Sequence, residues 1–266
     1  MRALIFLFSL LAGSVSAHEF WLEPLAYQVP SDGRLEAEIV NGQAFEGVEL
    51  SYLPQRFVRF EQFAGPRGLP VQGRLGSRPA LNAAPLTEGL NVVIYQSTTA
   101  TVTYDDWAKF QRFVDHKDFG DVRSLHEARA LPDANFREVY GRYAKTLINV
   151  GVGDGADMRT GLETEFVALT NPYTDDLSAG MRVQVFYGDD VRADTQVEVF
   201  DKAPDDTVTV TYLRTDANGI AVVPVTAGHS YMLDAVVLRE PGADLAASSN
   251  AVWETLWANL TFAVPE

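Results

Sequence analysis

Residues 181–225 read MRVQVFYGDDVRADTQVEVFDKAPDDTVTVTYLRTDANGIAVVPV. Apolar side chains recur at alternate positions in four short runs of this stretch, at 183–187, 197–199, 208–212 and 223–225. Such alternation is typical of β-strands, and the segments GDD at 188–190 and DANG at 216–219 are typical of turns between them. With a further alternating run at 256–262, the pattern predicts a seven-stranded, immunoglobulin-like β domain over residues 162–266.

The N-terminal half shows the same strand pattern in shorter runs. Examples lie at 35–39, 48–52 and 90–94, and Gly, Pro and Asn residues separate them. Between 104 and 147 the apolar period becomes that of helices, with one apolar face from Trp107 to Val114 and another from Phe136 to Leu147. This half is therefore predicted to be a β-sandwich with a helical excursion.

Together these patterns predict an all-β chain with two β-sandwich domains, immunoglobulin-like or transthyretin-like. The first would span residues 18–150, with the helical excursion at 104–147, and the second residues 162–266. Between them, the run GVGDGADMRTG at 151–161 has four glycines in eleven residues and is interpreted as a linker.

Composition restricts the classes of function. The 266 residues include 21 Lys and Arg against 36 Asp and Glu, which gives a formal net charge of −15 at pH 7. This charge repels nucleic acids and anionic bilayers, and no basic patch offsets it, so no nucleic-acid partner is expected. The chain has no Cys, which excludes disulfides, thiolate metal sites and thiol catalysis.

The first 17 residues have the features of a secretory signal peptide. A charged start at Arg2 precedes an apolar run at 3–12, and small residues end the segment at Ala17. The apolar run is shorter than the roughly 20 residues that cross a bilayer, and no later segment is long and apolar enough to do so. We therefore expect cleavage after Ala17 and no membrane span in the mature chain.

Cleavage at this point makes His18 the new amino terminus. An α-amine titrates near about 8, so it gives up its proton to a metal more easily than a lysine does. Together with Nδ1 of the same imidazole, it forms a chelate of two nitrogens, which divalent Ni, Co and Cu favour. The alternative is that His18 is simply the residue that follows the cleavage site.

Five segments of the sequence resemble a known family. They are HEFWLEP (18–24), RYAKTLINVG (142–151), GLETEFVALTNP (161–172), LRTDANGIAVVPV (213–225) and LWANLTFAV (256–264). In this order they resemble the NikM-like periplasmic family of unknown function that is associated with nickel and cobalt uptake. The resemblance implies a periplasmic two-domain β protein with an N-terminal His. It also implies a role in handling transition metals, with a membrane transporter or an outer-membrane receptor as partner.

The predicted metal ligands are His18 and His229. The chain has only four His, so a site for one ion is expected. His229 precedes a strand at 230–238, where a loop could bring it near the amino terminus, or it could be a surface residue of a hairpin. His116 and His126 have no second imidazole one helical turn away, and we interpret both as solvated polar residues.

Charged residues within apolar segments need partners. Asp234 interrupts the apolar run 231–237, and an inward carboxylate there would need a cation such as Arg182 or Arg239, so an exposed position is favoured. In the RYAK segment, Tyr143 is expected to pack, while Arg142 and Lys145 pair with acids across the seam between the halves. A site for a substrate anion is the alternative for these residues.

Three functions are compatible with these features. The first is an exported accessory protein that binds Ni, Co or Cu for uptake or homeostasis. The second is a metal-free interaction module for a protein or glycan partner, in which Trp21, Trp253 and Trp257 form stacking patches or belong to the core. The third is a copper oxidase with a histidine brace, which requires a second His facing His18. Hydrolase motifs are missing from the sequence, so no motif supports an enzyme, and a binding or accessory role is favoured.

Overall fold

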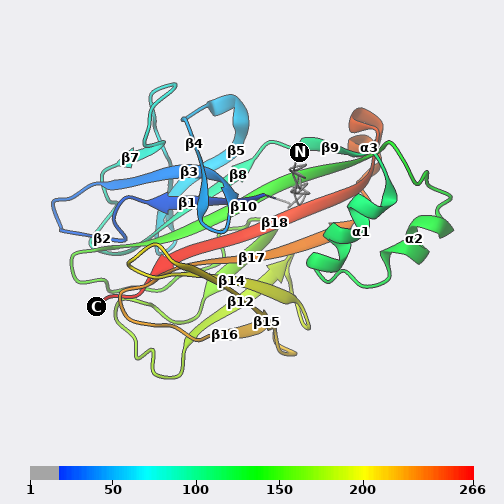
Figure 1. Cartoon of the computed structure of the whole chain (residues 1–266). Helices are drawn as coiled ribbons and strands as arrows, with labels where there is room; N and C mark the ends of the chain where they lie inside the picture. The colour runs from blue at the N-terminus through cyan, green and yellow to red at the C-terminus, as the bar shows by residue number, and fades with distance from the viewer. Residues whose placement is uncertain (1–17) are drawn as a thin grey trace, which may run out of the picture.

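The computed structural model describes residues 18–266, and the predicted signal peptide lies outside the described residues. Strands of these residues form three sheets, a central one of ten strands and two of four strands each (Figure 1). None of the helices in residues 18–266 has both the length and the apolar character that a membrane span requires.

The central sheet combines strands from both halves of the chain. Its order is β15 (Val208–Arg214), β14 (Gln196–Lys202), β17 (Ser230–Arg239), β18 (Ala251–Ala263), β10 (Phe136–Val150), β8 (Gly89–Ser97), β5 (Phe57–Ala64) and β6 (Arg67–Pro70). The short strands β2 (Gln28–Val29) and β9 (Ala100–Tyr104) also pair with β10. β10 belongs to residues 18–150 and β18 to residues 162–266, and the two strands pair in parallel. The two halves of the chain therefore meet inside one sheet.

The two smaller sheets each come from one half. One contains β1 (Glu19–Pro24), β3 (Leu35–Gln43), β4 (Glu46–Leu50) and β7 (Leu81–Ala83); the other contains β11 (Thr164–Ala168), β12 (Met181–Tyr187), β13 (Asp190–Val191) and β16 (Ile220–Val223). The helices are α1 (Trp107–His116), α2 (Val122–Ala128), α3 (Ala243–Ser249) and the 3₁₀ turn η1 (Pro54–Arg56).

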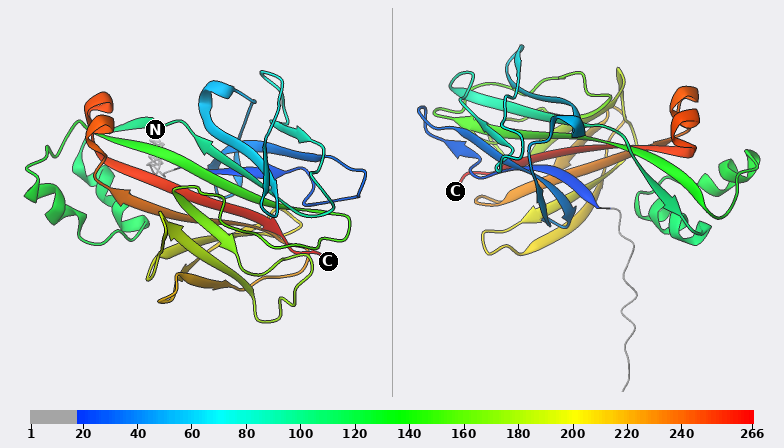
Figure 2. Two further views of the ribbon diagram at one scale, coloured as in Figure 1. Left: turned by 180° about the vertical axis from the view of Figure 1, so that it is seen from behind. Right: turned by 90° about the horizontal axis from the view of Figure 1, so that it is seen from above.

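The central sheet is the middle layer between the two smaller sheets (Figure 2). On one face of β10, Ala144 and Ile148 belong to the apolar core under β1 and β3. On the other face, Tyr143 and Leu147 belong to the core under β11 and β12. The prediction of an all-β, sandwich-type fold is therefore confirmed.

The predicted helix from Phe136 to Leu147 is wrong. Residues 136–150 form β10, and every residue from 141 to 150 is buried. A strand that is covered on both faces has no polar side to alternate with its apolar side. Its apolar residues therefore matched a helical spacing by chance.

The first predicted helix is confirmed as α1. The carboxylate of Asp106 caps it by accepting a hydrogen bond from the Lys109 backbone N–H at 2.8 Å. Its apolar face places Phe110 and Phe113 against Trp253 and Trp257, with stacked ring pairs in both cases. As a result, α1 and α2 cover one end of the central sheet (Figure 1).

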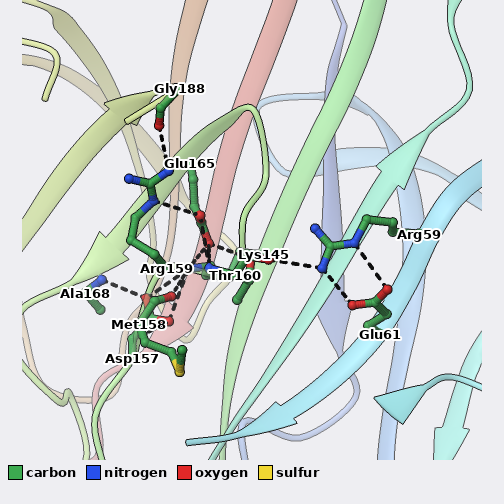
Figure 3. Close-up of polar contacts among 10 residues, drawn as sticks. All are labelled: Arg59, Glu61, Lys145, Asp157, Met158, Arg159, Thr160, Glu165, Ala168 and Gly188. Carbon is green, nitrogen blue, oxygen red and sulfur yellow. Dashed lines mark hydrogen bonds and ion pairs between the residues drawn. The ribbon is translucent and has the colours of Figure 1, made fainter. Parts of the chain in front are cut away.

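The glycine-rich run at 151–161 is bound to the sheets that it connects. Lys145 of β10 is fully buried, and its Nζ lies 2.8 Å from Glu165 and 3.1 Å from Asp157 (Figure 3). Nearby, Arg59 of β5 donates a hydrogen bond to the carbonyl oxygen of Thr160 at 3.0 Å. Burial raises the pKa of Asp157 and Lys145 opposes this rise, so the lysine is the cation that stabilises the charged form of this carboxylate.

Candidate functional site

A cavity of about 250 Å³ lies at the end of the central sheet that α1 covers. Its wall comes from several elements: His18, Asn41 of β3, Val102 and Tyr104 of β9, Lys109 and Phe113 of α1, Glu138, Tyr140 and Arg142 of β10, and Trp257 of β18. A second cavity of about 440 Å³ also has Asn41, Tyr140 and Arg142 in its wall. The second volume lies in the range of roughly 300–1,000 Å³ that is typical of small-molecule sites, and the first lies just below it.

Strand geometry places Arg142 in this wall. Glu138, Tyr140 and Arg142 occupy alternate positions of β10, so their side chains share one face of the sheet. Arg142 is also the register partner of Trp257 in the parallel pairing of β10 with β18. Its guanidinium carbon lies 4.2 Å from the ring centroid of Trp257 and 5.0 Å from that of Tyr140. The aromatic rings therefore hold the guanidinium in place through cation–π contacts.

Arg142 is a buried cation with an unused donor. The residue is only 8% exposed, and among residues 18–266 its Nη1 has no hydrogen-bond partner. Burial lowers the pKa of Arg142, and Asp234 is the acid that opposes this most strongly. The structure therefore differs from the expected pairing of Arg142 with an acid across the seam, whereas it confirms the pairing of Lys145 and the packing of Tyr143.

Glu138 forms no ion pair with Arg142. Its two carboxylate oxygens accept hydrogen bonds from Tyr104 Oη, at 2.7 Å, and from Thr255 Oγ1. Burial raises the pKa of Glu138, while these hydroxyls and the charge of Arg142 oppose the rise. Both oxygens of Glu138 are thus occupied by hydroxyl groups, and neither contacts the guanidinium of Arg142.

A buried ionic cluster lies beside the cavity. Lys117, directly after α1, places its Nζ 2.6 Å from Glu198 and 2.9 Å from Asp234. Burial alone would lower the pKa of Lys117, but the two carboxylates outweigh burial and raise it. Asp234 is only 2% exposed, so its predicted exposed position is wrong, and its partner is Lys117 rather than an arginine. His116 also binds this cluster, since its Nε2 lies 2.5 Å from Glu198.

His18 extends from β1 into the wall of the first cavity, and its own side chain is exposed. The next residue, Glu19, is buried and accepts a hydrogen bond from the Ala44 backbone N–H at 3.2 Å. Burial, with a contribution from Asp234, raises the pKa of Glu19 to about 7. The predicted amino terminus therefore lies between a cavity and a cluster of titratable groups.

His229 lies at the other end of the same sheet. Its Nδ1 is 2.6 Å from Asp201, just before β17 begins. Ser230 pairs with Ala263 of β18, whereas Val236 pairs with Trp257 in the cavity wall. The length of β17 between these two pairs, at about 3.4 Å per residue, places His229 roughly 20 Å from the cavity. The structure does not bring His18 and His229 together.

These observations can be compared with known proteins. A family model described as a domain of unknown function, DUF4198, matches residues 15–239. The chain belongs to the DUF4198 family. A search of curated proteins finds no significant match. The DUF4198 match includes His18 and Arg142 and ends with β17, so it does not include Trp257.

The remaining histidine of this DUF4198 chain has a structural role. His126 of α2 is fully buried, so its predicted solvated position is wrong. Its Nδ1 accepts a hydrogen bond from Trp253 Nε1 at 3.1 Å, which leaves Nε2 to donate to the carbonyl oxygen of Pro132 at 3.0 Å. Both ring nitrogens are therefore occupied in the packing of α2.

Among residues 18–266 of the DUF4198 chain, no three His, Cys, Asp or Glu side chains are grouped to hold a metal ion. Trp21, Trp253 and Trp257 are all buried, so they belong to the core. The sequence indicated His18 and, through the RYAK segment, Arg142 as candidate residues of this wall. Trp257 was considered only for a stacking patch or the core, and Asn41 and Glu138 gave no signal in the sequence.

Proposed function

We propose that the mature chain is an exported, periplasmic accessory protein that binds a divalent transition metal, nickel, cobalt or copper, through His18. The observation that carries this proposal is the place of His18. The residue that cleavage after Ala17 would turn into the amino terminus lines a cavity whose wall combines polar and apolar side chains. A metal bound there would be delivered to, or buffered for, a membrane transporter or an outer-membrane receptor.

The donor set near His18 suits a weakly held, exchangeable ion. The α-amine and the imidazole supply two nitrogens, and Asn41 supplies an oxygen in the same cavity wall. No further imidazole or thiolate is available from this wall, so a closed structural site is not expected. An open coordination sphere is the chemistry that a delivery protein needs, because the ion must leave again.

The resemblance of five segments to the NikM-like periplasmic family supports the same proposal. HEFWLEP, which begins with His18, and RYAKTLINVG, which begins with Arg142, both contribute residues to the cavity wall. Two separate parts of the resemblance thus meet at one place in the fold.

A histidine-brace oxidase is not favoured by the geometry. The other three imidazoles of residues 18–266 lie outside both cavities, against Glu198, Trp253 and Asp201. The alternative is a metal-free interaction module. The burial of its three candidate tryptophans removes the stacking patch that favoured it, so we keep it as the outcome if no metal binds.

The test is a titration of Ni²⁺, Co²⁺ and Cu²⁺ into the mature chain and into a variant with one Gly before His18. The extension moves the α-amine away from the ring and leaves the fold intact. We expect it to weaken binding at least about tenfold, which corresponds to about 1.4 kcal/mol. Isothermal titration calorimetry measures both affinities.

His229→Ala is the matched control, because it removes an imidazole at the far end of the sheet and should leave the affinity unchanged. Equal affinities of the mature and Gly-extended chains would contradict the proposal and favour the metal-free interaction module.

A further inference from the structure

We infer that Arg142 is a receptor for the carboxylate of a small organic acid with an apolar or aromatic body, bound in the cavity beside His18. The inference goes beyond metal binding and does not require it. It rests on the contacts of Arg142, on the charges around it and on the composition of the cavity wall.

The first observation is the burial of an unsatisfied guanidinium. Arg142 is 8% exposed and belongs to the walls of both cavities, and its buried Nη1 has no hydrogen-bond partner among the described residues. A buried donor without a partner is costly, and a ligand or ion that supplies the partner is one way in which proteins retain it. The position of Arg142 in the cavity walls is what points to a ligand here.

The second observation is that the neighbouring acids already have partners. Asp234 and Glu198 bind Lys117, and Glu138 binds the hydroxyls of Tyr104 and Thr255. Side-chain rearrangement would have to break one of these contacts to pair Arg142 within the protein. An anion from solution can pair with Arg142 without such a loss.

The third observation concerns the kind of anion. The planar guanidinium binds a carboxylate through two parallel hydrogen bonds. In the wall of the first cavity, the lysine that accompanies Arg142 is Lys109, which is already paired with Asp105 at 3.0 Å. The single unpaired guanidinium of Arg142 matches one carboxylate better than a doubly charged phosphate. Phe113, Tyr140 and Trp257 offer apolar surface for the body of the ligand.

The experiment compares benzoate with benzamide, which has nearly the same shape and no charge. The mature protein is titrated with each and followed by NMR chemical shifts. Benzoate should bind at least about tenfold more tightly than benzamide. In Arg142→Met, the affinity for benzoate should fall at least about 30-fold, because a charged hydrogen-bonded pair is lost. Arg142→Lys should recover only part of it, since lysine cannot form the paired hydrogen bonds.

Two controls separate binding from folding. Arg142→Met removes an unpaired buried charge, so it should unfold at no lower urea concentration than the wild type. Arg59→Met changes an arginine that is paired with Glu61 outside the cavity wall, and it should leave benzoate binding unchanged.

Equal binding of benzoate and benzamide, or unchanged benzoate binding in a folded Arg142→Met protein, would overturn the inference. So would the failure of benzoate to bind at millimolar concentrations. Binding of inorganic phosphate alone, with loss in Arg142→Met, would overturn the carboxylate assignment in favour of phosphate. None of these results bears on the metal titration, in which the Gly-extended chain is compared without any acid.

Discussion

Lys145→Met should lower the free energy of unfolding by about 3–5 kcal/mol. The substitution leaves Asp157 and Glu165, which are both buried, without the lysine that lies within 3.1 Å of each. Met fills a volume similar to that of the lysine stem, so the loss is electrostatic rather than a cavity. Urea denaturation of the wild type and the variant measures the difference.

Lys202→Met is the matched control for this change. Lys202 also contacts two acids, Glu23 at 3.7 Å and Asp206 at 3.1 Å, but at the surface. Its loss should cost less than about 1 kcal/mol. Adding Asp157→Asn and Glu165→Gln to Lys145→Met should recover part of the stability, because neither buried acid is then left charged without its lysine. Equal losses for the two lysines would show that the buried cluster contributes no more than a surface pair.

Lys117→Met should have the second largest effect, a loss of about 3 kcal/mol. Lys117 joins the end of α1 to β14 and β17 through Glu198 and Asp234. The loss should be smaller than for Lys145 because His116 still contacts Glu198. Hydrogen exchange should show faster opening in α1 than in the centre of β10, since the substitution releases the helix from the sheet.

The control for this second prediction is Lys109→Met. Lys109 lies on the same helix, but it pairs with Asp105, whose side chain is 72% exposed. We expect a stability change below about 1 kcal/mol and no change of exchange in α1. If Lys117→Met left the exchange of α1 unchanged, the ionic cluster would not be what holds the helix on the sheet.

The sequence predicts the all-β class and the helix α1 because their patterns are local. Alternation identifies strands with one polar face, such as β12, where Arg182 points outward between buried Met181 and Val183. It fails for β10, which is buried on both faces. It also fails for Asp234, because its partner Lys117 lies more than 100 residues earlier in the chain. An ion pair between residues far apart in the sequence does not change the local pattern of polar and apolar residues.

For the candidate site, the sequence predicts His18 from the cleavage pattern alone. The cavity around it could not be predicted, because Asn41, Arg142 and Trp257 become neighbours only after three distant strands assemble. The unpaired state of Arg142 was still harder to foresee, since the charge pattern of RYAK is the same for a paired arginine and for an unpaired one. Arg142 and Lys145 lie on opposite faces of β10, and the face decides which of the two contacts an acid.

The position of β18 has a consequence for folding kinetics. This strand, near the end of the chain, lies between β10 and β17 and so joins the middle of the sheet. The residues of β10 and β18 that pair are more than 100 positions apart in the sequence. Such contacts form only after a large loop has closed, which slows folding. Residues 18–150 should therefore gain little protection before β18 docks. We expect slow refolding and a single cooperative transition in which both halves gain structure together.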